Sequence, residues 1–352
     1  MPNWHESMQQ TFEYRRVDPI SWLDQEQITA VTESAITRDG TTETLVSATL
    51  NLTEAIEECY IRIYLVTLQN GITERFPLAT VLVQTPDKSF DGKVTTISLD
   101  AYSPLTELKE NQPPLGYSLG KGENIMDSAY KLCRENMRAP VIQTNMTDTL
   151  RSSFVANSDD TWLTYNKDLI ATVNYTFDLD EMGQLLFAPN QEAISLQPVT
   201  TFDDGNSSIL YPDITINRDM YGIPNVVEVI YSSGRSTYYA RAENRNEDSP
   251  ISIQNRGREI VQRITNPSFS GEPTEAQLHE YADKVLKQTS TLEYTVTYTH
   301  GYYPVRVGDC VLLNYEKAGL NNVKAKIISQ TIQCTPGCPV SEKAIYTRNL
   351  WG

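Results

Sequence analysis

Hydrophobic and polar residues alternate most strictly in the segment 291–299. One side of this segment is hydrophobic and the other is polar, with Leu292, Tyr294, Val296 and Tyr298 set against Glu293, Thr295, Thr297 and Thr299. A period of two with aromatic and β-branched residues predicts a half-buried strand. Pro304 and the pair Gly308-Asp309 then predict a turn, and 310–315 predicts the returning strand. The clearest pattern in the chain therefore indicates β-structure.

The first hundred residues show the same period. Alternating or apolar segments predict strands at 28–37, 41–52, 59–68, 72–83 and 94–99. Turn signals separate them, at Asp39-Gly40, Asn70-Gly71 and Asp91-Gly92. Pro77 predicts an edge or a bulge in its strand, because proline has no backbone N–H to donate. Roughly six strands in this length are typical of a small antiparallel barrel or sandwich.

The middle of the chain changes from a period of two to helical spacing. Residues 101–119 predict a linker, because they are rich in proline and glycine. A helix is predicted next, since three apolar residues recur on one helical face: Ile125, Ala129 and Leu132. Pro140 predicts the end of this helix.

A second helix is predicted to start at Ser158 or Asp159, either of which can cap it, and to run to about residue 170. Two short segments with a turn at 181–183 then predict a hairpin: 175–178 and 184–187. This part of the chain is therefore predicted to form a small α+β domain.

The last third returns to strands and adds one helix. Residues 190–208 are polar and predict a loop, after which strands are predicted at 209–217, 226–231, 237–243, 324–333 and 344–350. A capping box of Thr274 and Gln277 predicts a helix at about 274–288, with one apolar face formed by Leu278, Ala282 and Val285. The predicted fold is mainly β with an α+β insert, in three domains: 1–105, 106–207 and 208–352.

Composition narrows the class of protein. The chain has 352 residues, of which 39% are hydrophobic, and this length allows two or three domains. No run approaches the roughly 20 apolar residues of a membrane helix, and the N-terminus lacks the apolar core of a secretory signal. No membrane insertion is therefore expected. The five cysteines are scattered and odd in number, which predicts no disulfide framework and indicates a reducing cytoplasm.

The formal net charge of −16 argues against a protein that grips nucleic acid. Counting by segment places the excess acid in the first two predicted domains. Residues 1–105 and 106–207 each carry 7 basic and 15 acidic residues, whereas 208–352 carries 15 of each. Solubility is the ordinary explanation. A sharper hypothesis is an acidic channel wall that repels DNA and lets it slide through.

Several short phrases, spread over the chain in a particular order, carry a resemblance. They are Tyr14-Arg-Arg-Val-Asp18-Pro19-Ile-Ser-Trp22, the segment 28–37, Asp160-Thr-Trp162, Asp180-Glu-Met-Gly183, Ile223-Pro224 and Arg306-Val-Gly308-Asp309. In this order they resemble the tube-like hub family of contractile phage baseplates. The same plan recurs in the N-terminal region of type VI secretion spikes and in phage tail-associated proteins.

The resemblance implies two tail-tube-like β-barrels, 1–105 and 208–352, which flank the α+β insert. It also implies a homotrimer, whose six barrels form a ring that joins the tail tube, or a tube initiator protein, to a central spike protein. Other baseplate proteins would contact this ring, and DNA would pass through it without specific binding. The expected location is the tail baseplate of a virion, assembled in the host cytoplasm. Because the sequence stops at Gly352, any tail hydrolase is expected on another chain.

Cys334 and Cys338 form the one close cysteine pair, at a spacing that half of a zinc site uses. Cys310 could approach them in space. The only histidines are isolated in sequence from the cysteines and from one another: His5, His279 and His300. A turn between two strands explains the pair better than a metal site or a disulfide formed after export. No metal and no cofactor is therefore predicted.

Catalytic chemistry is not predicted either. A glycosidase needs two opposed carboxylates, and the acidic pairs are Glu57-Glu58, Asp159-Asp160 and Asp203-Asp204. Adjacent residues on a strand point to opposite faces, so Glu57 and Glu58 would not form one site. A helix cap explains Asp159-Asp160 better than catalysis does, and a turn explains Asp203-Asp204 better. The sequence contains no nucleophile elbow, zincin, phosphate-loop or dinucleotide motif. No catalytic, cofactor-binding or metal-ligating residue is therefore predicted.

Two other functions stay open. One is a tail-tip hydrolase of cell wall or polysaccharide, which a carboxylate cleft would favour. The other is a carbohydrate-binding module with tyrosine platforms, for which the candidates are Tyr238-Tyr239 and Tyr302-Tyr303.

Two further groups of residues are predicted to have structural roles. The basic cluster is predicted to make salt links to a neighbouring subunit, and it comprises Arg256, Arg258 and Arg263. The tryptophans near the termini are predicted to pack in the core, with docking onto partner rings as the alternative: Trp4, Trp22 and Trp351.

Overall fold

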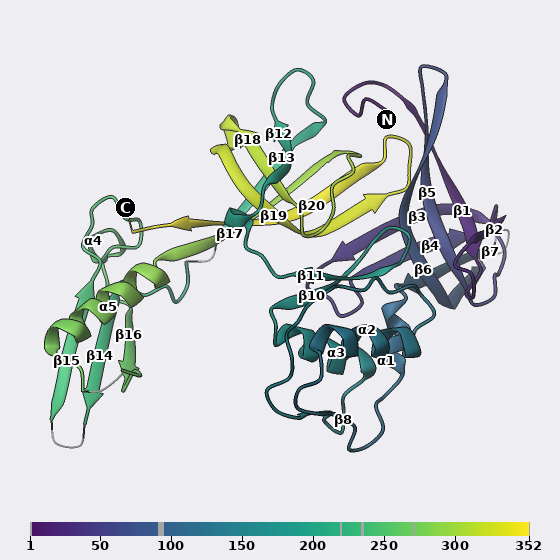
Figure 1. The fold of residues 1–352 in the computed structure, drawn as a ribbon. Coiled ribbons are helices and arrows are strands. Elements are labelled where there is room, and N and C mark those ends of the chain that lie inside the picture. Colours follow the sequence, from purple (N-terminus) through teal and green to yellow (C-terminus); the bar gives the residue numbers. More distant parts are fainter. Residues whose placement is uncertain (1, 91–94, 219, 234–235, 270–271, 352) are drawn as a thin grey trace. The chain divides into compact units, whose positions relative to one another are not determined.

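The computed structural model describes residues 2–90, 95–218, 220–233, 236–269 and 272–351 (Figure 1). The chain is mainly β, as predicted. It divides into two compact units: unit 1 comprises Met1–Ile214 and Tyr298–Ala344, and unit 2 comprises Thr215–Thr297 and Ile345–Gly352. The predicted Asp91-Gly92 turn and the first residue of the strand predicted at 94–99 lie outside the described residues.

The first hundred residues of unit 1 form neighbouring antiparallel strands in the order β3-β4-β7-β6-β5-β1-β2. Their bounds are β1 Gln9–Val17, β2 Asp24–Gln27, β3 Val31–Asp39, β4 Val46–Leu52, β5 Cys59–Gln69, β6 Ile72–Phe90 and β7 Thr95–Tyr102. The structure confirms that strands are present at 28–37, 41–52, 59–68 and 72–83, although their ends differ from those predicted. Strands β1 and β2 were not predicted, because their residues alternate weakly and carry many charges.

The turns in this region follow the predictions only in part. Asn70-Gly71 forms the expected tight hairpin, since Gln69 pairs directly with Ile72. Pro77 lies next to a bulge between β5 and β6, as expected. The hairpin predicted at Asp39-Gly40 is present, because β3 and β4 pair as antiparallel neighbours, but its loop is longer than predicted, since β4 starts only at Val46. The Gly40 N–H donates to the Ile328 carbonyl oxygen at 2.9 Å.

The insert contains more helix than predicted. Its elements are α1 Leu105–Glu110, β8 Ser118–Leu119, α2 Ile125–Asn136, β9 Phe154–Val155, α3 Trp162–Ala171, β10 Tyr175–Leu179 and β11 Leu185–Pro189. Helix α1 corrects the predicted linker, since Leu105 and Leu108 are buried in the core of unit 1. The predicted cap at Ser158 or Asp159 is also wrong, because the Thr161 hydroxyl accepts the Thr164 N–H in a capping box. Helix α3 packs against α2 and β10.

The remaining strands of the large sheet, together with two short 3-10 helices, come from residues 193–349. They are η1 Ala193–Ser195, β12 Pro198–Asp203, β13 Leu210–Arg218, β17 Thr291–Gly301, β18 Cys310–Tyr315, η2 Glu316–Ala318, β19 Leu320–Gln333 and β20 Pro339–Asn349. Strand β17 has the strict alternation of burial that its sequence predicts. Residues 190–208 are not wholly a loop, because β12 pairs in parallel with β18. Strand β19 pairs with β3, so both ends of the chain contribute to one sheet.

Unit 2 is a smaller α/β body. Its sheet has the order β15-β14-β16, with β14 Val226–Ser232, β15 Thr237–Glu243 and β16 Val261–Thr265. Its helices are α4 Ile253–Arg256 and α5 Glu275–Thr289. The predicted capping box of α5 is confirmed, since Thr274 accepts from the Gln277 N–H. Helix α5 lies against this sheet (Figure 1). Leu278 and Ala282 of its predicted apolar face are buried in the core, together with Leu286, whereas the predicted Val285 is only partly buried.

The two compact units do not coincide with the three predicted domains. The unit boundary falls inside β13, β17 and β20, so residues 215–297 and 345–352 form a body of their own within the predicted domain 208–352. The division at 105 and 207 stays a prediction. None of the helices in the described ranges has the length and apolar content that a membrane crossing requires.

Candidate functional site

Three of the phrases noted in the sequence meet in unit 1. Trp22 lies between β1 and β2, Arg306 lies between β17 and β18, and both contact the turn 180–183 that joins β10 to β11. The Trp22 Nε1 donates to the Met182 carbonyl oxygen at 2.7 Å. The Arg306 Nε lies 3.0 Å from Glu181 Oε1. We call this set of contacts the 180–183 junction; its members are Trp22, Arg38, Arg62, Thr80, Arg306 and residues 180–183.

The shape of the turn depends on Asp180 and Gly183. The Asp180 carboxylate accepts the Gln184 N–H at 2.7 Å, and the Asp180 carbonyl accepts the Gly183 N–H at 3.0 Å. Gly183 has a φ of +76°, and a Cβ at this position would lie 2.8 Å from Thr80 Cβ and 3.2 Å from Trp22 Cζ2. Glycine therefore permits both the turn and the close approach of the insert to β6.

Arg62 provides the buried polar centre of the junction. This residue of β5 is 1% exposed, so its guanidinium needs a full set of partners. Its Nε donates to Thr80 Oγ1 at 2.9 Å, and its Nη1 lies 2.5 Å from Asp24 Oδ1. Its Nη2 donates to the Met182 carbonyl oxygen at 3.1 Å. One arginine thus connects β5, β6, the start of β2 and the insert.

Ion pairs extend the junction to the last third of the chain. Glu181 Oε1 lies 3.0 Å from Arg38 Nη1 of β3 and 3.0 Å from Arg306 Nε. Arg306 Nη2 lies 3.3 Å from Asp178 Oδ2 and donates to the Leu179 carbonyl oxygen at 2.7 Å. The insert is therefore held by charges from both the first and the last third of the sequence.

The carboxylates around Arg306 are desolvated. Burial raises the pKa of Asp178, of Asp180 and of Asp309 above the usual range, and the charge of Arg306 opposes the shift at each of them. The Asp309 carboxylate also accepts the Arg306 backbone N–H at 2.8 Å. Arg306 is thus the common partner that compensates for the burial of these acids.

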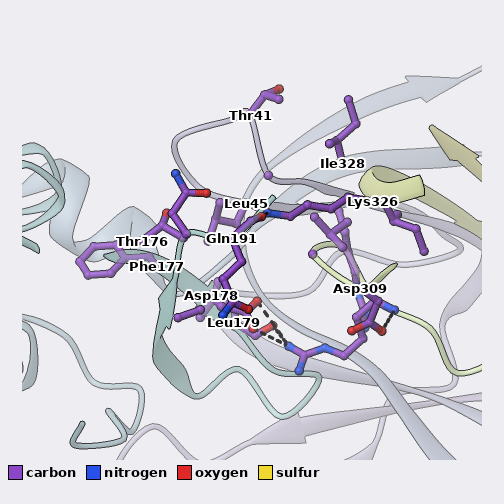
Figure 2. A pocket seen from close by; sticks show the side chains of 18 of the residues that line it. Thr41, Leu45, Thr176, Phe177, Asp178, Leu179, Gln191, Asp309, Lys326 and Ile328 are labelled. Carbon is purple, nitrogen blue, oxygen red and sulfur yellow. Dashed lines mark hydrogen bonds and ion pairs between the residues drawn. The ribbon is translucent and has the colours of Figure 1, made fainter. Parts of the chain in front are cut away.

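A cavity of about 490 Å³ borders this cluster. Figure 2 shows that Asp178 and Leu179 of the insert face the Arg306–Asp309 segment, whereas Lys326 reaches toward Gln191. The Lys326 Nζ donates to the Gln191 carbonyl oxygen at 2.6 Å. Both acidic residues of the lining, Asp178 and Asp309, bond to Arg306. The arrangement thus joins the insert to the segment between β17 and β18 through Arg306.

The cysteines and histidines do not gather. The described residues contain no group of three or more His, Cys, Asp or Glu side chains that could hold a metal ion. Cys334 and Cys338 are free and buried, and burial raises the pKa of the Cys334 thiol to about 11. His279 is exposed on α5. His300 is buried near the end of β17, with its Nε2 3.3 Å from Glu342 Oε1.

The acidic pairs lie apart and serve local structure. Asp203 accepts the Gly205 N–H at 2.9 Å, which confirms the predicted turn. Asp160 accepts the Asn157 N–H at 2.7 Å in the loop before α3. Glu57 and Glu58 are exposed in the loop before β5, so the strand geometry assumed for them is wrong.

The basic cluster bonds within unit 2. Arg256 donates to the carbonyl oxygens of Met220 and Ile223, at 2.7 and 3.0 Å. The Arg263 Nε lies 2.8 Å from Glu228 Oε2. The predicted salt links to a neighbouring subunit stay a prediction, since the Arg263 side chain is 71% exposed.

The aromatic candidates are mostly packed. Trp4 lies edge-on to Phe76 and Tyr302, with ring centroids 5.1 Å apart in each case. Trp22 is buried in the core of unit 1. The remaining candidates of unit 2 pack against its core, namely Tyr238 and Trp351. Among the tyrosines considered for sugar binding, Tyr239 is exposed, Tyr238 and Tyr303 are half-buried, and Tyr302 is buried.

Sequence reasoning missed Arg62 and Thr80. A signal for Arg62 is present, since it is the one charged residue in the apolar segment Cys-Tyr-Ile-Arg-Ile-Tyr-Leu-Val-Thr-Leu of β5. A charge in a buried strand requires buried partners. Those partners come from positions as far away as Met182, which no local pattern identifies.

Two solved structures share this fold. The chain superposes on the tail protein from Neisseria meningitidis MC58 with a TM-score of 0.62, at 12% identity, over 97% of this chain and 98% of that one. It superposes on the prophage MuSo2 43 kDa tail protein from Shewanella oneidensis with a TM-score of 0.60, at 12% identity, over 95% of this chain and 97% of that one. No protein-family model and no curated protein matches the sequence. The resemblance expected from the sequence is thus confirmed at the level of the fold, which the chain shares with these two phage tail proteins over nearly its whole length.

Proposed function

We propose that this chain is a structural baseplate hub of a phage or phage-like tail. Three copies would form a ring that joins the tail tube to a central spike and encloses a channel for DNA. The observation that carries the proposal is the shared fold with two phage tail proteins over at least 95% of every chain compared. A likeness of this extent covers both ends of the chain and the insert, as a dedicated tail component requires.

The distribution of charge supports a channel that does not bind DNA. Unit 1 carries 19 basic and 34 acidic residues, a net charge of −15, whereas unit 2 carries 10 and 11, a net charge of −1. A surface with this excess of acid repels the phosphate backbone, so DNA would pass without specific binding. We propose that 1–105 and 208–352 are the expected tube-like barrels, and that the partners are the tail tube, the spike and other baseplate proteins.

The contacts of the 180–183 junction support a structural role over an enzymatic one. Its charged groups bond to one another and to backbone carbonyls, which stabilises the position of the insert. The protein would act in the virion after assembly in the host cytoplasm, with no catalysis on this chain.

The native mass of the purified protein, together with negative-stain images, tests the proposal. A mass of three subunits and a ring with a central hole is the expected result. A compact single subunit at every concentration, with measurable binding to cell-wall glycans, would contradict the hub and favour a carbohydrate-binding module.

A further inference from the structure

Two places in unit 1 expose aliphatic side chains in pairs. The loop 18–23 between β1 and β2 exposes Ile20 (93%) and Leu23 (67%). The segment 191–199, which leads through η1 into β12, exposes Ile194 (76%) and Val199 (53%). We call them the apolar loop and the apolar segment. Strands β2 and β12 lie apart in unit 1 (Figure 1), so one subunit cannot cover its own apolar loop with its own apolar segment.

The apolar loop is held rigidly although its tip is exposed. The Trp22 N–H donates to the Asp18 carbonyl at 2.8 Å, and the Asp18 N–H donates to the Leu23 carbonyl at 2.9 Å. The Asp18 carboxylate accepts from the Ile20 N–H at 3.1 Å and from the Ser21 hydroxyl at 2.7 Å. Trp22 itself is buried. Such a loop presents Ile20 and Leu23 in one orientation, and this lowers the entropy lost when a partner binds.

The apolar segment is flanked by positive charge. The Lys324 Nζ donates to the Leu196 carbonyl oxygen at 3.3 Å, and the Lys326 Nζ donates to the Gln191 carbonyl oxygen at 2.6 Å. Both lysines therefore lie against the backbone that carries Ile194 and Val199. Glu192, which is also exposed in this segment, carries the opposite charge, so the segment and its two lysines together have a net charge of +1 within a unit of net charge −15. The apolar loop carries the opposite sign, through Asp18.

We propose that the apolar loop of one copy docks on the apolar segment of the next copy. Ile20 and Leu23 would pack against Ile194 and Val199, and Asp18 would face the two lysines. The inference rests on the proposed ring of copies, and it names the surfaces that would form that ring. Two different patches that meet head to tail can close into a ring, whereas a self-complementary patch gives a dimer.

A second copy is the favoured occupant, because this one chain carries both halves of the contact. The two patches match in apolar character and are opposite in flanking charge. Burying charge pairs beside an apolar centre also fixes orientation and opposes wrong pairings. Contact at these patches would let two strongly acidic units approach where repulsion is weakest.

Cross-linking of two single-cysteine additions tests the contact. Purified full-length Ile20→Cys and Val199→Cys proteins would be treated with a short bismaleimide, separately and after mixing. We expect a cross-linked pair only in the mixture, and species of up to three subunits from the double variant. The unsubstituted protein is the control for the native cysteines, of which Cys59 is half-buried and the other four are buried.

A second measurement uses the assembly itself. Ile20→Asp should weaken association about tenfold or more, as for a truncated interface anchor. Leu115→Asp is the matched control, since Leu115 is 88% exposed in the insert, away from both patches, and this change should leave the native mass unaltered.

The outcomes separate this inference from the proposed hub. A three-subunit mass without the mixed cross-link overturns the contact and leaves the hub standing. Cross-linking of Ile20→Cys to itself indicates a self-complementary contact, and cross-linking to a different tail protein in assembled particles assigns the loop to that protein; either result overturns the inference. A single-subunit mass at every concentration, without cross-links, contradicts both.

Discussion

Unit 1 and unit 2 differ in how far their stabilising contacts reach along the sequence. The sheet and helix of unit 2 that form its buried core lie within 226–289. In unit 1, Ser329 of β19 pairs with Asp39 of β3, and Arg62 reaches the insert at Met182. Unit 2 thus needs local order, whereas unit 1 needs distant parts of the chain to meet. Changes to the 180–183 junction should therefore act on unit 1 alone.

The two units also differ in net charge, and the division by unit differs from the division that the predicted domains gave. Counting by predicted domain places the acid before residue 207, whereas counting by unit gives −15 for unit 1 and −1 for unit 2. The near-neutral part of the chain is a compact body. Any repulsion of DNA should then arise from unit 1, because the long-range field follows the summed charge.

The largest effect that separates the units is expected at alkaline pH. Burial raises the pKa of Tyr14 and of Tyr165 to about 12, from an ordinary value of 10.0. Burial also raises the pKa of further tyrosines of unit 1: Tyr60, Tyr298 and Tyr302. The unfolded chain then ionises first, so this contribution to stability is fully present below pH 10 and is lost as the pH rises through about 12. In unit 2 the same effect acts on Tyr346.

We therefore expect unit 1 to unfold before unit 2 between pH 10 and about 12, values that follow from the ordinary and the raised pKa of Tyr14. Tyrosinate absorbance would report the ionisation, and cleavage by an alkaline-tolerant protease, mapped by mass spectrometry, would report which unit opens. Tyr14→Phe should reduce the dependence on pH. If the first cleavage fell within 226–289, unit 2 would unfold before unit 1, which would contradict this prediction.

Loss of Arg62 should have the next largest effect. Arg62→Ala would leave the Asp24 carboxylate without its buried cation and the Met182 carbonyl with Trp22 Nε1 as its remaining donor. Removing one member of a buried ion pair costs about 3–5 kcal/mol. Hydrogen exchange followed peptide by peptide should show lost protection in β5, β6 and the insert. Protection in α5 should not change.

Arg75→Ala is the matched control for Arg62. Arg75 Nη2 lies 3.6 Å from the same carboxylate, Asp24 Oδ2, but its side chain is 43% exposed. A surface pair of this kind contributes about 0–1 kcal/mol. An equal loss from both variants would mean that charge near Asp24, and not the buried junction, stabilises unit 1.

Gly183→Ala tests how closely the insert must approach the sheet. The new Cβ would lie 2.8 Å from Thr80 Cβ at a φ of +76°. Backbone strain and overpacking together should cost about 2–4 kcal/mol in unit 1. Gly116→Ala isolates the strain, because Gly116 has a φ of +78° with no atom within 4 Å of its Cβ position. Gly116→Ala should cost about 1 kcal/mol. Equal losses in denaturant titrations would show that contact with Thr80 contributes nothing.

The same contrast explains which elements the sequence could predict. Strand β17, the Asn70-Gly71 hairpin and helix α5 have signals within a few residues, and all three are confirmed. Helix α1 was missed because surrounding prolines obscured Leu105 and Leu108. Strand β12 was missed because its pairing with β18 crosses more than a hundred residues.

The candidate site was predictable in its parts but not in its assembly. The short sequence phrases that carry the resemblance to baseplate hubs contain Trp22, residues 180–183 and Arg306. That they meet depends on tertiary pairing, and sequence spacing does not encode which carbonyl or carboxylate each side chain will find. The extra partner Arg62 was marked only by its charge in an apolar strand.

The smallest effect is expected from a substitution in unit 2, which should leave unit 1 unchanged. Thr274→Ala removes the acceptor of the Gln277 N–H at the start of α5, and loss of such a cap costs about 1 kcal/mol. Hydrogen exchange should increase in α5 and in β14 and β15, on which the helix packs, and not in β5 or the insert. Thr274→Ser retains the hydroxyl and should behave as the unsubstituted protein does. Because the capping box is local, a loss that spread to the 180–183 junction would show that the two units unfold as one, and that the short reach of the contacts in unit 2 does not make it independent.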